Sequence, residues 1–473
     1  MKILNTLSKT LEEFKPISSN RVNFYHCGPT VYWTQHIGNM RAIVLSDFIV
    51  RSLRYLGYKV VFVRNYTDVG HLTGDNLGDA DQGEDRMEKA AKREKLDPQT
   101  IANKYIKEFE HDTDILNTIE PNYKPRATEV IPESIKMIQV LINKGFVYTT
   151  DLAIYFDISK AKNYSALSGQ SIDDKLQGTG RAEVQDPQKK HPADFIVWVF
   201  KAGKHTNALQ AWPSPFSSSL VKNGEGFPGW HLECSVMSKK FLGDTVDIHM
   251  GGREHIPIHH PNEIAQSEAA NGVKFVHYWL HNEWLMANNA KISKSIGNGY
   301  SVKEIINKGF DPLALRYFFL GAHYRSRQNF TWEALESAQT ALDRLKGVIR
   351  SLSLVHPGEI DSALKEQFTS HLENDFNVPQ ALAVTWDVAK SKDLSDEFKK
   401  ATLLDFDKVL GLKLNEVKEE KVNITLELQE LLNKRVQARK DKDFDLSDKL
   451  RTQIEVLGYT VEDTPGGQVT RSK

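Results

Sequence analysis

One strand–helix–strand unit near the N-terminus constrains the fold of this chain more than any other feature. Residues 21–27 (RVNFYHC) are short, β-branched and aromatic, and a loop with Gly28 and Pro29 follows. Residues 42–57 (AIVLSDFIVRSLRYLG) have apolar positions at helical spacing, and residues 59–65 (KVVFVRN) return as a continuous apolar strand. Strands joined in this way pair in parallel and gather ligands at their carboxyl ends. We therefore predict an α/β fold with a site after the first strand.

Length and composition predict several domains and exclude some classes of protein. A chain of 473 residues is too long for a single hydrophobic core. Its net charge of −1 means that nucleic-acid binding would need local basic patches. Two cysteines cannot build a disulfide framework, and the start MKILNTLSKTLEEF lacks the apolar region of a signal peptide. We expect a cytoplasmic, monomeric enzyme that does not contact a membrane.

Changes in pattern divide the chain into a sheet domain with an insertion, a helical region and a small C-terminal domain. The boundaries are expected at 1–120 and 227–300 for the two halves of the sheet domain, 121–226 for the insertion, 301–415 for the helical region and 416–473 for the C-terminal domain. The insertion contains one strand-like segment, LAIYFDI, and is interpreted as partly irregular beyond it. The C-terminal domain is predicted to be helical with a basic cluster, Lys434, Arg435, Arg439, Lys440 and Lys442.

The loop 30–41 (TVYWTQHIGNMR) follows the first strand and opens the first helix. His36, Gly38 and Asn39 would lie at the helix N-terminus, where free N–H groups and the helix dipole favour an anion such as a phosphate. Gly38 would let the backbone come close to the ligand. The alternative is a capped helix start with His36 on the surface.

A second loop, 290–299 (AKISKSIGNG), carries Lys291 and Lys294 among small hydroxyl residues and glycines. A cationic loop of this kind can close over a triphosphate and neutralise charge as pyrophosphate leaves. The alternative is an ordinary solvated loop.

Four residues form a candidate metal site. His259 and Glu263 are four residues apart and would share a helix face. Cys234 lies shortly before them, in GWHLECS, and Cys27 ends the first strand at the ligand edge of the sheet. Two thiolates, an imidazole and a carboxylate suit tetrahedral zinc. Each residue alone also has a plainer explanation, as a core cysteine or a surface pair.

Together these motifs resemble a known family. HIGN and KISKS resemble the HIGH and KMSKS signatures of class I aminoacyl-tRNA synthetases. Within that class, YHCGPTVY, VRNYTDV, GWHLECS, DIHMGG, HHPNEIAQSEA, KISKSIGN and DPLALRYFFLGAHYRS look like the cysteinyl-tRNA synthetase family. The ending ARKDKDFDLSDKLRTQIEVLGYTVEDTPGG is similar to the C-terminal tail of that family, so the likeness covers nearly the whole chain in order.

The resemblance implies a fold and a reaction. The fold would be a Rossmann-type catalytic domain with a connective insertion, an all-α bundle that binds tRNA, and a small anticodon-binding domain. The reaction would join L-cysteine and magnesium-bound ATP to give cysteinyl-adenylate and pyrophosphate, then pass the cysteinyl group to the 3′ end of cysteine tRNA. One zinc ion per chain would be bound by Cys27, Cys234, His259 and Glu263, which are the four candidates above.

The resemblance also assigns the amino-acid pocket. Trp230 would lie beside the bound cysteine, and Thr67 and Glu254 would line its pocket. The position of Glu254 is usually aspartate in the family, and the longer acid could still hold the ammonium group. Since an ordinary pocket separates near-isosteres by only about 10- to 200-fold, a soft cation that prefers a thiolate would explain how cysteine is told from serine without an editing domain.

The phosphate-binding roles fall on the two signature loops. His36, Asn39, Lys291 and Lys294 would stabilise charge on the transferring phosphate, and His36, Gly38, Asn39 and Lys294 would bind ATP. Asn39 replaces the second histidine of the signature, and an amide cannot carry its charge. The stretch 159–228 also looks longer and differently composed than is usual.

Two other functions are possible. A cysteine ligase that uses an amino-sugar acceptor has a similar catalytic half but lacks the tRNA-reading region, whereas this chain continues past Asp311 with helices and a basic tail. A non-catalytic tRNA-binding paralogue would have lost the KISKS lysines or the metal ligands, and all of them are present.

Overall fold

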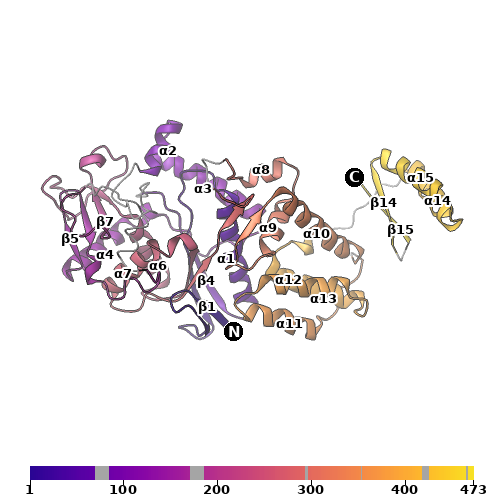
Figure 1. Cartoon of the computed structure of the whole chain (residues 1–473), viewed down its shortest axis with the longest axis horizontal. Helices are drawn as coiled ribbons and strands as arrows, with labels where there is room; N and C mark the ends of the chain where they lie inside the picture. The colour runs from indigo at the N-terminus through magenta and orange to yellow at the C-terminus, as the bar shows by residue number, and fades with distance from the viewer. Residues whose placement is uncertain are drawn as a thin grey trace.

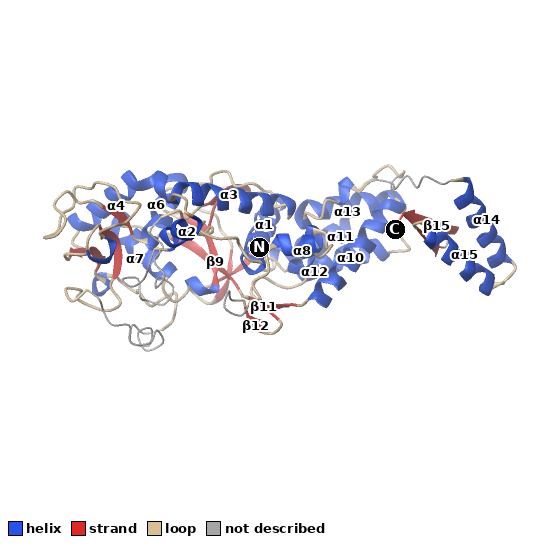
Figure 2. Cartoon of the chain, turned by 90° about the horizontal axis from the view of Figure 1, so that it is seen from above, coloured by secondary structure: helices blue, strands red, loops and turns tan. Residues whose placement is uncertain are grey.

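The structure is a computed structural model that describes residues 1–69, 85–170, 186–292, 297–352, 354–417, 425–464 and 467–472. Figures 1 and 2 show the insertion, the sheet domain, the helical bundle and the C-terminal domain following one another along the long axis. Within the described residues, no helix combines the length and the apolar character needed to cross a membrane.

The central sheet has four parallel strands in the order β10-β9-β3-β4. They are β3 (Arg21–His26), β4 (Lys59–Arg64), β9 (Val246–Gly252) and β10 (Val276–Asn282). Helix α1 (Ile37–Tyr55) joins β3 to β4, which confirms the predicted strand–helix–strand unit. Because β3 pairs with both β4 and β9, the two halves of the sheet domain close into one sheet across the insertion.

Alternating residues of the strands build a separate core on each face of this sheet. Phe24 of β3 packs into the core that contains the buried residues of α1, whereas its neighbour Tyr25 packs into the core beneath α6 (Trp230–Leu242) and α7 (His259–Asn271). This follows from the two-residue period of a strand. Helices α2 (Arg86–Glu94) and α3 (Pro98–Ile115) contribute to the α1 face. The sheet therefore presents different helices to the two sides of its carboxyl edge.

The insertion folds around a second, antiparallel sheet in the order β5-β6-β7-β8. Its elements are α4 (Ile131–Asn143), β5 (Val147–Thr149), β6 (Ala153–Phe156), β7 (Phe195–Phe200) and β8 (Gly226–Pro228). The prediction of a partly irregular insertion missed β7, whose six residues FIVWVF are all buried. Both faces of this strand are covered, so its residues do not alternate between polar and apolar. Because the segments around it are polar, this single short apolar run was not recognised as a strand.

From Ser301 to about Leu410 the chain is largely helical, as predicted. It contains α8 (Val302–Asn307), α9 (Pro312–Leu320), α10 (Trp332–Ser351), α11 (Ser362–Glu373), α12 (Val378–Lys390) and α13 (Asp396–Leu410). A small sheet that the sequence did not predict, β12 (Ala290–Lys291), β11 (Leu285–Ala287) and β13 (Gln328–Phe330), joins the start of the KISKS loop to this region. An N-terminal hairpin, β1 (Lys2–Asn5) and β2 (Thr10–Glu13), precedes the central sheet in the chain. Short 3₁₀ turns occupy Ala127–Val130, Ile158–Lys160, Gly203–His205, Arg253–His255 and Leu414–Glu416.

The C-terminal domain corrects two predictions. It is not wholly helical, because an antiparallel hairpin of β14 (Tyr459–Thr464) and β15 (Gly467–Ser472) follows α14 (Leu426–Lys440) and α15 (Phe444–Val456). Arg435 does not belong to an exposed basic cluster, since it is fully buried and donates two hydrogen bonds to Asp463, at 2.8 and 2.7 Å. Arg435 lies three residues after Leu432 and therefore on the core face of α14. Its charge is paired with Asp463 inside the domain.

A buried ion pair joins the sheet domain to the bundle. Asp47 of α1 and Arg316 of α9 are both almost completely buried, with 2.5 Å between Oδ2 and the guanidinium. Arg316 also donates to the carbonyl oxygens of Leu410 and Leu116. Burial alone would raise the pKa of Asp47, but Arg316 and Arg51 outweigh it, and the pKa lies below its usual value. The charged pair therefore stabilises the junction wherever Asp47 is ionised.

We predict that Asp47→Asn lowers the free energy of unfolding at pH 7 by about 3–5 kcal/mol, because it leaves a buried guanidinium without its counter-charge. The pKa of Asp47 is lower in the folded than in the unfolded state, so the stabilisation is complete above the unfolded value of about 4 and is lost as the pH falls through the folded pKa. The difference between wild type and variant should accordingly shrink in acid. Urea unfolding at several pH values measures it.

The control for this prediction is Glu13→Gln, which breaks the exposed pair of Glu13 and Lys15. Exposed pairs contribute about 0–1 kcal/mol, so this variant should unfold like the wild type. Equal free energies of unfolding for the two variants at pH 7 would contradict the assignment of Asp47 as a residue that stabilises the junction between the sheet domain and the bundle.

Candidate active site and metal centre

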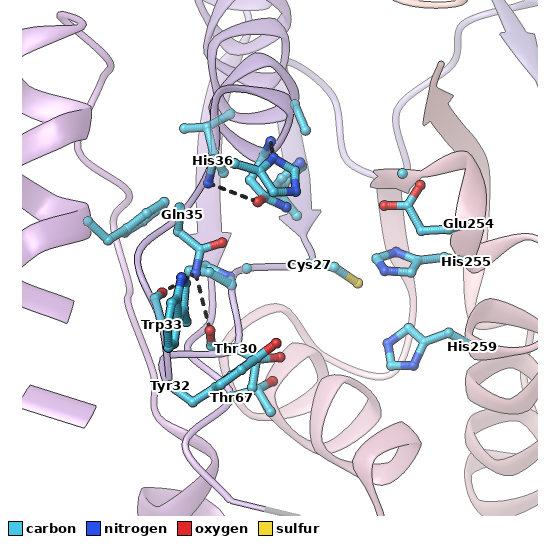
Figure 3. Close-up of a pocket in the computed structure, with 18 of the residues that line it drawn as sticks. Cys27, Thr30, Tyr32, Trp33, Gln35, His36, Thr67, Glu254, His255 and His259 are labelled. Carbon is cyan, nitrogen blue, oxygen red and sulfur yellow. Dashed lines mark hydrogen bonds between the residues drawn. The ribbon is translucent and has the colours of Figure 1, made fainter. Parts of the chain in front are cut away.

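A cavity of about 320 Å³ opens at the carboxyl edge of the central sheet, where the sequence predicted a site. Figure 3 shows its two walls. The loop between β3 and α1, with Thr30, Tyr32, Trp33, Gln35 and His36, forms one wall. The opposite wall comes from the segment after β9, with Glu254, His255 and His259.

The cavity brings together most of the predicted site residues. Those that line it come from every predicted group: Cys27, Cys234 and His259 from the metal site, Thr67, Trp230 and Glu254 from the amino-acid pocket, and His36 and Asn39 from the phosphate site. Three others lie elsewhere. Glu263 is fully buried behind the wall, Gly38 packs beneath His36, and Lys291 lies outside the cavity lining in β12. Lys294 lies outside the described residues.

His36 and Asn39 cap α1 reciprocally. The Asn39 backbone N–H donates to Nδ1 of His36 at 3.2 Å, and the His36 backbone N–H donates to Oδ1 of Asn39 at 3.3 Å. A neutral His36 with an accepting Nδ1 carries its ring proton on Nε2, which makes that atom a donor suited to an anion. A Cβ at Gly38 would lie 2.9 Å from Cε1 of His36, so glycine is required for this ring position. Asn39 thus has a local structural role in place of a second histidine.

The four predicted metal ligands converge. Cys27 lies just after β3 and its N–H donates to the carbonyl of Met250 in β9, while Cys234 comes from α6 and His259 and Glu263 from α7. All four donor atoms lie within 4.8 Å of one another. The two sulfurs are 3.9 Å apart, and His259 Nε2 is 3.0 Å from Glu263 Oε1. Tetrahedral zinc with Zn–S distances of about 2.3 Å needs sulfurs about 3.8 Å apart, so this donor set fits such an ion.

A second set shares two of these residues and was not predicted. Cys27 and Glu263 also lie within 4.8 Å of His249 and His260. The two imidazoles are fully buried, pack against the ring of Trp279 and do not line the cavity. Only the first set places three of its members on the cavity wall, where a bound metal could meet a substrate. Consecutive histidines in HHPNE were the sequence signal for the second set.

The surroundings of the cluster are arranged to favour neutral side chains. Burial raises the pKa of Cys27 well above its usual value and also raises that of Glu263. Burial lowers the pKa of His231 to about 3 and that of His249 and His260 well below the usual value. A divalent cation would reverse this preference for the Cys27 thiol and the Glu263 carboxyl, because metal binding requires their deprotonated forms.

Residues outside the ligand set hold His259 in place. Nδ1 of His259 is 2.8 Å from Nδ1 of His231, which leaves Nε2 facing Glu263. Trp230 stacks on the His259 ring with 4.1 Å between centroids. Hydrogen bonds of this kind fix the orientation of a ligating imidazole. His231 stands in GWHLECS, but its role was not apparent until α6 and α7 were seen side by side.

The fold and the cavity together define the class of protein. A parallel sheet that is split by an insertion, with its site at the N-terminus of the HIGN helix and a helical bundle behind it, is the architecture of a class I aminoacyl-tRNA synthetase. A family model described as the tRNA synthetases class I (C) catalytic domain matches residues 13–340. Two solved structures share the fold: a methionyl-tRNA synthetase of Mycobacterium tuberculosis in complex with methionyl-adenylate, and LeuRS of Agrobacterium radiobacter K84 in a ternary complex with tRNA.

The likeness to these structures is one of fold alone. The first has a TM-score of 0.55 and 15% identity over 90% of this chain and 96% of its own. The second has a TM-score of 0.58 and 10% identity over 86% and 85%. Sequence comparisons distinguish between the families within this class of synthetases. A model of the cysteinyl-tRNA ligase anticodon binding domain matches residues 423–471.

Two relatives match over nearly their whole length. Cysteine--tRNA ligase 1 of Burkholderia lata is 42% identical over 99% of this chain and 96% of its own. Cysteine--tRNA ligase of Treponema denticola is 39% identical over 98% of each. The chain therefore belongs to the cysteinyl-tRNA synthetase family, as its motifs indicated.

The two overlapping ligand sets generate a prediction. Cys234→Ser and His259→Gln should each abolish tight metal binding, because each removes a donor of the cavity-facing set. His249→Gln should retain the metal. Inductively coupled plasma mass spectrometry of the purified proteins measures the metal content, and thermal unfolding checks that each variant is folded. A metal that persists in Cys234→Ser but disappears in His249→Gln would transfer the site to the second set.

Proposed function

We propose that the chain is a cysteine–tRNA ligase that activates L-cysteine with ATP and transfers it to the 3′ end of cysteine tRNA. The convergence of Cys27, Cys234 and His259 on the wall of the cavity, with Glu263 buried directly behind them, carries this proposal. Family membership agrees with it, since relatives called cysteine–tRNA ligase match over the whole chain.

Zinc is the metal that suits this donor set of two sulfurs, one nitrogen and one carboxylate oxygen. Bound there, it would favour a thiolate over a hydroxyl and so select cysteine over serine. Cys27, Cys234, His259 and Glu263 would hold it. His231 would orient the imidazole ligand through its contact at Nδ1.

The cavity wall supplies the other contacts for cysteine. Trp230, held flat against His259, forms the side on which the amino-acid side chain would lie. Thr67 is buried at 2% exposure, and its N–H donates to the carbonyl of Pro29, which fixes it at the floor. Glu254 lies on the opposite wall with an exposed carboxylate, which would pair with the α-ammonium group. These contacts would hold the α-carboxylate ready to attack ATP.

The N-terminus of α1 would receive ATP, bound as its magnesium complex. The backbone N–H of Gly38 and the Nε2 donor of His36 would meet the phosphates, while the N–H groups of Ile37 and Asn39 are used within the protein and Asn39 keeps the turn in shape. Lys291, with Lys294 from the same loop, would neutralise charge on pyrophosphate as it leaves. No protein nucleophile is required, because the cysteine carboxylate forms the new bond to the α-phosphorus and pyrophosphate departs.

The tRNA would be bound by the bundle and the C-terminal domain. The match of residues 423–471 to an anticodon binding domain supports this partner and disfavours an amino-sugar acceptor. Lys434, Arg439, Lys440 and Lys442 remain candidates for contact with RNA phosphates, whereas Arg435 is excluded by its burial. The cytoplasmic location and the monomeric state stay predictions.

The proposal predicts that the purified protein exchanges pyrophosphate into ATP with cysteine and that serine is poorer by more than about 200-fold in kcat/KM, beyond what a pocket without a metal achieves. Aminoacylation of cysteine tRNA should be lost with a chelator and restored by zinc. Radiolabelled exchange and charging assays measure both.

Two further outcomes of these assays would favour one of the alternative functions. Charging of an amino-sugar in place of tRNA would favour the other ligase, and absence of any cysteine-dependent exchange would favour a non-catalytic paralogue. Equal exchange with cysteine and serine would refute selection by the metal.

A further inference from the structure

The side chain of Trp284, in the turn between β10 and β11, contacts the proposed amino-acid pocket from outside. Its indole Nε1–H donates to Oε2 of Glu254 at 2.9 Å. Glu254 lines the cavity, whereas Trp284 does not. The hydrogen bond engages one carboxylate oxygen and leaves Oε1 to accept from a ligand.

Gly252 leaves room for the same carboxylate on a second side. A Cβ at this position would lie 2.3 Å from Oε1 and 2.5 Å from Cδ of Glu254. The Glu254 side chain therefore folds back over the backbone of Gly252, in space that only glycine leaves open. The hydrogen bond from Trp284 thus holds the carboxylate in a position that the absence of a side chain at Gly252 permits.

The indole is itself held by charged groups. The guanidinium carbons of Arg253 and Arg327 lie 5.7 and 5.8 Å from its ring centroid, and Nζ of Lys291 lies 4.8 Å away. Glu283 forms ion pairs with both arginines and so fixes them around the ring. Cations at these distances are attracted to an aromatic face, so the three cations restrain the position of the Trp284 ring.

The hydrogen bond from Trp284 matters because the Glu254 side chain is long and has several rotatable bonds. A glutamate has one more rotatable bond than an aspartate, and holding a longer side chain in one rotamer costs more entropy. A charge-assisted hydrogen bond from a rigid indole offsets that cost before the substrate arrives.

We propose that Trp284 is a positioning residue that holds the Glu254 carboxylate in place for the α-ammonium group of the substrate. The inference rests on the proposed function, in which that substrate is cysteine. Trp284 acts through Glu254 and touches neither the substrate nor ATP.

The test is Trp284→Phe, which keeps an aromatic ring for the three cations and removes the N–H donor. In pyrophosphate exchange, KM for cysteine should rise about tenfold, the effect expected for a lost hydrogen bond to a charged group. KM for ATP should stay within about twofold, because no residue proposed to bind ATP is changed and the phenyl ring keeps an aromatic face for Lys291. Trp386→Phe is the matched control, since its indole donates to the Tyr317 hydroxyl at 2.8 Å in the bundle and its loss should leave both values unchanged.

A double-mutant cycle separates positioning from a general structural role. In a Glu254→Ala background, adding Trp284→Phe should change kcat/KM for cysteine by less than about twofold, because the indole then has no carboxylate to hold. An undiminished effect in that background, or equal increases in KM for cysteine and ATP, overturns the inference. So does an unchanged KM for cysteine in Trp284→Phe.

A second variant, at Gly252, is expected to displace the Glu254 carboxylate without changing Trp284. Gly252→Ala would displace the flexible end of Glu254 while Trp284 stays intact, and its φ of −74° suits alanine. It should raise KM for cysteine and leave the melting temperature near that of the wild type, and an unchanged KM contradicts the described position of Glu254. Wild-type protein without cysteine-dependent exchange would instead refute the proposed function, so the two failures are distinguishable.

Discussion

The site depends on the burial of two thiols, an imidazole and a carboxyl group at one edge of the sheet. Such groups cost free energy when they lose water, and burial pushes the pKa of Cys27 and Glu263 upward. One divalent cation bound there would offset the cost for all the donors at once. The histidines and tryptophans packed around the cluster, including His231 and Trp230, keep it dry and oriented.

This cluster requires the two halves of the sheet domain to meet. Cys27 comes from the first half, while Cys234, His259 and Glu263 come from the second, with the whole insertion between them. The parallel pairing of β3 with β9 and the hydrogen bond from the Cys27 N–H to Met250 bring the halves into register. On the other face, the ion pair of Asp47 and Arg316 joins the HIGN helix to the bundle. Fold and site therefore depend on the same few long-range contacts.

Much of the architecture was predictable from local patterns. The strand–helix–strand unit and the His259–Glu263 spacing on α7 appear in the structure as the sequence indicated. The strand β7 and the hairpin of β14 and β15 were missed, because a strand covered on both faces and a polar hairpin lack a clear period. Arg435 was misassigned to the surface, since a buried partner such as Asp463 cannot be seen in a linear pattern.

The sequence by itself determined which residues are candidates for the chemistry, because the types and spacings of the HIGN, KISKS, cysteine and HHPNE motifs are local properties. Only the tertiary structure decided which of them act together. It separated the cavity-facing set with Cys234 and His259 from the deeper set with His249 and His260. It also placed Trp284 against Glu254. These relations arise from packing between segments far apart in the chain, and their distances are set by the sheet and not by the number of intervening residues.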